Sequence, residues 1–100
     1  MSSFQLEYYS KAEKDLEKLR DAKEVIVILD QIQRHLEKKP FPYPPLKKRI
    51  QGFSWPLFRL RIDTKKESYR VFYIFKELKI TILRIVKKKD ADKTIRSLRK

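Results

Sequence analysis

Hydrophobic residues change their spacing twice along the chain. Residues 4–8 alternate between apolar and polar, which predicts a short strand with one buried face. Apolar side chains then recur at helical spacing through residues 12–36, which predicts two helices in sequence. From residue 46 the alternation returns, so further strands are expected. They cover residues 46–51 (a basic, edge-type strand), 57–63, 68–75 and 78–86.

Capping signals divide the helical region. Ser10 and Glu13 have the spacing of a capping box, so the first helix is expected to begin there, and Asp21 with Glu24 repeats the signal for a second helix. Asp90 is the expected N-cap of a last helix. The apolar stripe of the second helix consists of Val25, Ile28, Leu29, Ile32 and Leu36, and that of the last helix of Ala91, Ile95 and Leu98.

The proline-rich segment at residues 40–45 ends the second helix and cannot form a central strand, because each proline lacks an N–H donor. It is expected to be a rigid strap that lays Phe41 and Tyr43 on the core. A ligand for a proline-binding module and an aromatic platform for bases are the alternatives. Gly52, the only glycine, marks a turn that requires positive φ or close backbone approach.

These elements give the order β-α-α-β-β-β-β-α in a single domain over residues 1–100. The expected fold is α+β, with a two-helix hairpin packed on a mainly antiparallel sheet. The chain has no cysteine, which excludes disulfides, a thiol nucleophile and cysteine-based metal sites. The longest aliphatic run, residues 25–29, is far shorter than the roughly 20 residues of a membrane span, so a cytoplasmic protein is expected.

Charge is distributed unevenly between the two parts of the chain. Residues 1–45 carry eight basic and eight acidic side chains, whereas residues 46–100 carry 18 basic and five acidic ones, which is the whole net charge of +13. Such an excess attracts polyanions. Nucleic acid is the first candidate partner, and an anionic membrane or an acidic protein is the next. A merely solvated, solubility-promoting surface is the alternative.

Three arginines form the candidate chemical site. Arg59 and Arg61 are two residues apart on one predicted strand, and Arg70 lies on the hairpin partner, so all three can share one sheet face. Guanidinium groups bind phosphate through two hydrogen bonds and stay charged, so they could hold an RNA backbone and stabilise added negative charge in a transition state. The alternative is that the three arginines are merely solvent-exposed residues on a hydrated sheet face, with no binding role.

The remaining polar residues give weaker signals. His35 is alone on the second helix, where a structural role is expected. Asp63, Glu67 and Asp90 lie near the basic segments, but no pair has a spacing typical of glycosidase or metal chemistry. No metal or other cofactor is therefore expected.

Over nearly its whole length the chain resembles the RelE/ParE toxin superfamily, and the motifs that carry the resemblance lie in the second half. The shared motifs are LKKRIQG at residues 46–52, LFRLRI at 57–62, YRVFY at 69–73 and IVKKKD at 85–90. The resemblance implies a microbial RNase-like fold and a type II toxin-antitoxin system with a cognate antitoxin as partner. RelE-like members cleave messenger RNA in the ribosomal A site through attack of the ribose 2′-hydroxyl on the adjacent phosphate, with no metal.

Carried over by position, the resemblance implies catalytic roles for four basic residues. Arg61 and Arg70 would stabilise the transition state, while Arg59 or Lys89 would position the backbone or assist proton transfer. The basic residues expected to bind RNA are Lys47, Lys48, Arg49, Lys87 and Lys88. The expected function is a ribosome-dependent endoribonuclease toxin whose partners are an acidic antitoxin, messenger RNA and the ribosome, with no membrane contact.

Three departures from the family pattern keep two rival functions open. The tyrosine that follows the last basic segment in many family ribonucleases is missing from residues 90–95, Lys87 stands in the place of a histidine, and the hairpin at 63–68 lacks the common glycine. Arginine is a poor proton acceptor, so the general base is not evident. The rivals are a ParE-like DNA gyrase inhibitor without nuclease activity and a non-catalytic basic RNA-binding domain.

Overall fold

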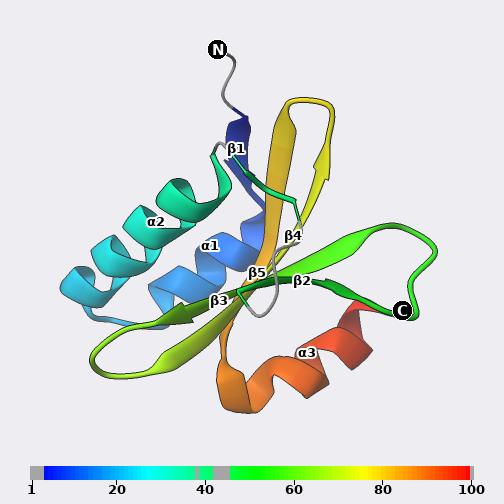
Figure 1. Ribbon diagram of the computed structural model, residues 1–100. Helices are drawn as coiled ribbons and strands as arrows, with labels where there is room; N and C mark the ends of the chain where they lie inside the picture. The colour runs from blue at the N-terminus through cyan, green and yellow to red at the C-terminus, as the bar shows by residue number, and fades with distance from the viewer. Residues whose placement is uncertain (1–3, 38, 42–45, 100) are drawn as a thin grey trace.

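The computed structural model describes residues 4–37, 39–41 and 46–99, and these form one five-stranded sheet with helices on both sides (Figure 1). The sheet order is β1-β5-β4-β3-β2, in which β2 to β5 are antiparallel neighbours and β1 runs parallel to β5. The strands are β1 (Gln5–Tyr8), β2 (Lys47–Ile50), β3 (Leu57–Asp63), β4 (Ser68–Lys76) and β5 (Lys79–Lys87). The helices are α1 (Ser10–Glu17), α2 (Ala22–Leu36) and α3 (Ala91–Leu98), with the 3₁₀ turn η1 (Lys88–Asp90) before α3.

The predicted α+β fold and element order are therefore confirmed, with η1 as an addition. Helices α1 and α2 cover one face of the sheet (Figure 1), and the main core lies between these layers. Its fully buried members include Ile28, Ile32 and Leu36 of the α2 stripe, which pack with the inward residues of β3 to β5. The residues of β3 that face this core are Phe58, Leu60 and Ile62, as their alternation predicts.

The first helix begins at Ser10 as predicted, but the predicted capping box is absent. The N-cap of α1 is Tyr9, and Ser10 is already helical, with no side-chain capping bond. The reason is the preceding strand: Tyr9 N–H donates to the Ile82 carbonyl of β5 at 2.9 Å, so the chain leaves the sheet at Tyr9 and turns directly into the helix. The cap at Asp21 is confirmed, since its carboxylate accepts hydrogen bonds from the N–H groups of Lys23 and Glu24. Asp90 is the N-cap of α3 as predicted, without a side-chain capping bond.

The start of the proline-rich segment packs on the core as predicted. Pro40 is fully buried, and its carbonyl accepts a hydrogen bond from the Tyr73 hydroxyl at 2.7 Å. The Phe41 ring makes edge-to-face contacts with Phe4 and Phe75 at centroid distances of 6.0 and 5.4 Å, although half of the side chain is exposed. Tyr43 lies outside the described residues.

The opposite face of the sheet carries a second, smaller buried region. Leu57 and Phe72 are fully buried but do not belong to the main core, and by strand alternation they point to this other side. Of the described elements, α3 lies on this side (Figure 1). It begins beyond the end of β5 and ends beside the turn before β3, where Arg99 contacts Phe53. The last helix therefore crosses the face that carries the arginines.

A buried acid joins α1 to an otherwise open strand edge. Strand β1 pairs with β5 only as far as Ile82, so the end of β5 has no described strand on that side. Asp15 of α1 fills the gap: its carboxylate accepts from Ile85 N–H at 2.9 Å and from Arg84 Nε and Nη2 at 2.8 and 3.0 Å. This arrangement blocks the strand edge and fixes α1 against β5.

Candidate functional site

The three arginines lie on the same face of the sheet, as the sequence predicts. Arg61 of β3 pairs directly with Arg70 of β4, and Arg59 comes two residues before Arg61 on β3. Lys48 of β2 pairs with Arg59 and so adds a fourth cation to this face. We call these residues, Lys48, Arg59, Arg61 and Arg70, the arginine face.

The members of the arginine face differ in exposure. Arg70 is only 6% exposed, and its Nη1 donates to the Tyr69 carbonyl at 2.9 Å and to Ser68 Oγ at 3.3 Å. The Arg61 side chain is 44% exposed, and its Nε lies 3.5 Å from a carboxylate oxygen of Asp63. Arg59 is half-buried. Arg61 is thus the guanidinium that an incoming ligand meets first.

Like charges are held together here at an electrostatic cost. Burial, and then the charges of Arg59 and Arg61, lower the pKa of Arg70; burial and the charge of Arg61 lower the pKa of Arg59. The nearby acid Asp63 has a lowered pKa, mainly because it accepts a hydrogen bond from the Ser68 hydroxyl. A bound phosphate would relieve the repulsion among the guanidinium groups, so this face is suited to an anionic ligand.

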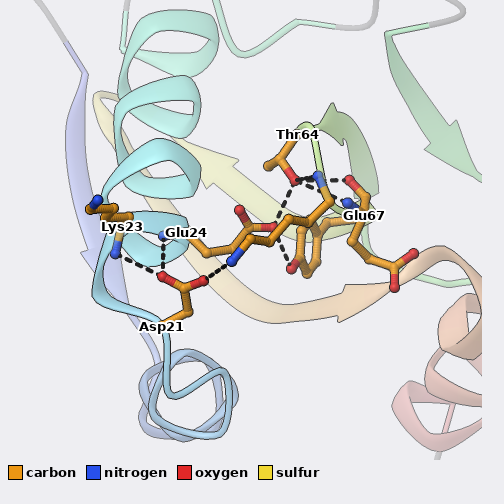
Figure 2. Close-up of polar contacts among 7 residues, drawn as sticks. Asp21, Lys23, Glu24, Thr64 and Glu67 are labelled. Carbon is orange, nitrogen blue, oxygen red and sulfur yellow. Dashed lines mark hydrogen bonds and ion pairs between the residues drawn. The ribbon is translucent and has the colours of Figure 1, made fainter.

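Polar contacts from α2 hold the hairpin that joins β3 to β4. Figure 2 shows Glu24 reaching from α2 toward Thr64 in the turn. The buried Glu24 carboxylate accepts from Thr64 Oγ1 at 2.7 Å and from the Tyr69 hydroxyl at 2.8 Å, while Lys66 pairs with Asp21. Thr64 Oγ1 also accepts from the N–H of Glu67 at 3.1 Å. Because both strands of the hairpin carry arginines, these contacts fix the geometry of the arginine face.

The C-terminal end of α3 is held at the turn between β2 and β3. The Arg99 guanidinium lies 5.6 Å from the centre of the Phe53 ring, and its Nη2 is 3.5 Å from the Gln51 carbonyl oxygen. Gly52 has the predicted positive φ, +93°, and a Cβ added there would lie 2.8 Å from Arg99 Nη2. The only glycine therefore serves both the turn and the approach of Arg99.

Replacement of Gly52 by alanine is expected to lower the free energy of unfolding by about 1 kcal/mol, because alanine is strained at this φ and crowds Arg99. Urea denaturation followed by circular dichroism measures the change. Ser54→Ala, in the same turn and exposed, is the control and should leave stability unchanged. Equal stability of the two variants would show that the turn tolerates a side chain at residue 52.

Two of the predicted site lysines lie in a different place from the arginines. Lys87 and Lys89 line a cleft of about 710 Å³ at the edge of β5, bounded by α1, the β3–β4 hairpin and α3. None of the described residues lining it belongs to the arginine face. Lys87 lies 3.8 Å from Glu67 across this cleft. Lys89 therefore lines a cleft to which the described residues of the arginine face do not contribute.

The remaining predicted RNA-binding residues are also divided. Lys47 is buried on the core side of β2, where its ammonium donates to the carbonyls of His35 and Lys39 at 3.2 and 2.6 Å, so its position does not suit RNA contact. Arg49 is exposed but faces the same side as Lys47, and Lys88 is exposed in η1. His35 is half-buried on α2, and this burial, followed by the charges of Lys47 and Arg34, lowers the pKa of its imidazole, which suits the expected structural role.

Sequence reasoning missed the buried ionic groups. Asp15 lies between Ala12 and Leu16, on the apolar side of α1, and that placement was the available signal. Among the described residues, no three His, Asp or Glu side chains form a group that could hold a metal ion. No helix in the described part of the chain is long and apolar enough to cross a membrane.

The fold and the arginine face define a small basic α+β protein with a cationic sheet face. Residues 6–92 match the family described as ParE toxin of type II toxin-antitoxin system, parDE, and the chain belongs to this family. The resemblance to the RelE/ParE superfamily is thus confirmed, and membership implies a cognate antitoxin as partner.

One solved structure shows the same fold. It is described as a copper-bound mutant toxin from Helicobacter pylori, and it aligns with 87% of this chain and 97% of its own at a TM-score of 0.57. The sequence identity is 16%, so this likeness extends to the fold alone. A search of curated proteins finds no match.

Proposed function

We propose that this toxin is a ribosome-dependent endoribonuclease that cleaves messenger RNA in the ribosomal A site. The observation that supports it is the register pairing of Arg61 with Arg70, with Arg59 beside them, on one sheet face. Guanidinium groups placed in this way can bind the non-bridging oxygens of one phosphodiester and stabilise the extra negative charge of a pentavalent transition state.

The proposed reaction uses the RNA's own nucleophile. The ribose 2′-oxygen bonds to the adjacent phosphorus and the bond from phosphorus to the 5′-oxygen breaks. The 2′-hydroxyl loses its proton and the departing 5′-oxygen gains one, which leaves a 2′,3′-cyclic phosphate and a 5′-hydroxyl. The arginines supply charge and orientation. Since arginine is a poor base, we assign proton removal to a group of the ribosome, and Lys87 and Lys89 to contacts with flanking RNA.

Primer extension on messenger RNA, with purified toxin and with ribosomes present or absent, tests this proposal. Discrete cuts that require ribosomes, with cyclic phosphate at the upstream end, are expected. An intact message at toxin concentrations that arrest growth would exclude the nuclease function.

A gyrase inhibitor without nuclease activity is the second candidate. The family description favours it. The described residues of the arginine face, which are all cations, also provide no group suited to accept the proton of the 2′-hydroxyl. The neighbouring Tyr69 does not fill this role, because its hydroxyl donates to Glu24 and burial raises its pKa. A DNA gyrase supercoiling assay run beside the primer extension distinguishes the two. Inhibited supercoiling with intact message would establish the second candidate.

Lys47 and Lys48 are neighbours in sequence whose side chains face opposite sides of β2, and they offer a matched test of RNA contact. Lys48→Gln is expected to weaken binding of a short single-stranded RNA. It should also reduce by about 1 the slope of the logarithm of RNA affinity against the logarithm of salt concentration. Lys47→Met is expected to leave RNA affinity unchanged and to lower the free energy of unfolding by about 1 kcal/mol, because two carbonyls lose a donor. Equal losses of RNA affinity in the two variants would contradict this division.

A further inference from the structure

The turn between β2 and β3 presents an aromatic pair at the border of the arginine face. The rings of Phe53 and Trp55 lie 5.1 Å apart in an edge-to-face arrangement, and Trp55 is 37% exposed. Trp55 is the only tryptophan of the chain. Neither ring belongs to the main core, so packing of the core does not explain the pair.

The pair borders the side of the sheet that carries the arginines. Arg99, at the end of the helix that crosses this side, lies against the Phe53 ring. Along the chain, the turn leads into β3, on which Leu57, Arg59 and Arg61 point to the same side at intervals of two residues. A strand rises about 3.3 Å per residue, so the aromatic pair and Arg61 are separated by a distance that a few nucleotides can span.

We propose that Trp55, with Phe53 beside it, is a stacking site for one unpaired base of an RNA strand whose phosphate lies on the arginine face. This inference rests on the proposed binding of RNA. Aromatic side chains next to a cationic groove stack bases of single-stranded nucleic acid, because every base has a π-face and the backbone is held by the neighbouring charges. Arg99 places a cation next to the Phe53 ring and can contact the phosphate of the stacked nucleotide.

An RNA occupant fits this surface better than an apolar protein segment does. The chain from residue 46 onward has 18 basic and five acidic residues, and the aromatic pair lies among them, next to Arg99 and near Arg59. An apolar protein segment would have to leave these guanidinium groups without a matching anion. A single strand of RNA provides both a base for the rings and phosphates for the arginines.

Trp55 fluorescence tests the inference, since no other tryptophan contributes. The probes are a short oligoadenosine and an abasic chain of the same length. Oligoadenosine is expected to quench Trp55 and the abasic chain to leave the emission unchanged. Trp55→Ala should weaken oligoadenosine binding about tenfold, measured by the anisotropy of labelled RNA, and should leave abasic binding unchanged. Trp55→Phe should restore most of the affinity, and Tyr9→Ala, which removes an exposed aromatic at the start of α1, should have no effect.

Two results would overturn the inference in distinguishable ways. In the first, Arg61→Gln weakens RNA binding, Trp55→Ala does not, and RNA does not quench Trp55. This result would remove the stacking site and leave the arginine face in place. No RNA binding by the wild type would remove the stacking site alone, because ribosome-dependent cleavage is tested separately by primer extension. Trp55 quenching by an antitoxin peptide would then assign the aromatic pair to a protein contact.

Discussion

Asp15→Ala is expected to lower the free energy of unfolding by about 3 kcal/mol or more. The substitution removes the carboxylate that accepts from Arg84 and from Ile85 N–H, and it leaves a half-buried guanidinium and a buried backbone donor without that acceptor. Domains of this size have total stabilities of about 5 to 15 kcal/mol, so the loss is a large fraction of the whole. Urea denaturation followed by circular dichroism measures it.

Three control variants separate the buried ion pair from other effects. Asp30→Ala breaks the exposed pair with Arg34 on α2, where both side chains are more than half exposed, and should cost about 0.5 kcal/mol or less. Asp15→Asn keeps an acceptor without the charge and should lie between the two. Arg84→Met in combination with Asp15→Ala should recover part of the loss, because no unpaired charge remains. A loss for Asp15→Ala no larger than that for Asp30→Ala would show that water replaces the carboxylate.

The strands could be predicted from the sequence because alternation states directly which face each residue occupies. Phe58, Leu60 and Ile62 had to share the core side, and Arg59 and Arg61 had to share the other. The capping box at Ser10 failed because the spacing describes only local bonds. The helix start was decided instead by a bond from Tyr9 to a strand 73 positions later in the chain.

Lysine roles could not be predicted from charge alone. Lys47 and Lys48 are identical in type and adjacent, yet the first donates to two carbonyls near the end of α2 and the second pairs across the sheet with Arg59. Lys89 lies beyond the end of β5 in a 3₁₀ turn, where strand alternation no longer applies. The arginines escape this ambiguity because all three lie within regular, paired strands.

Arg61→Gln is expected to reduce the rate of ribosome-dependent cleavage by about 10² to 10³-fold, the loss typical when one donor to a developing anion is removed. Arg61 is the most exposed of the three arginines, and the Asp63 carboxylate lies 3.5 Å from its Nε, beyond the distance of a strong charged hydrogen bond. A substrate phosphate can therefore compete for this guanidinium. Its replacement should leave the free energy of unfolding within about 0.5 kcal/mol of the wild type. Single-turnover cleavage on programmed ribosomes, together with urea denaturation, measures both quantities.

Arg61→Lys separates charge from geometry at the same position. Lysine keeps the positive charge but cannot present two parallel donors to a phosphate, so an intermediate rate is expected if the guanidinium fork matters. Arg34→Gln, on the exposed side of α2, makes the same charge change away from the arginine face and should cleave at the wild-type rate. If Arg61→Gln and Arg34→Gln lose activity equally, then net charge alone governs cleavage. Both substitutions remove one positive charge, but only Arg61→Gln removes a donor from the arginine face. Equal losses would therefore show that the pairing of Arg61 with Arg70 does not contribute to catalysis.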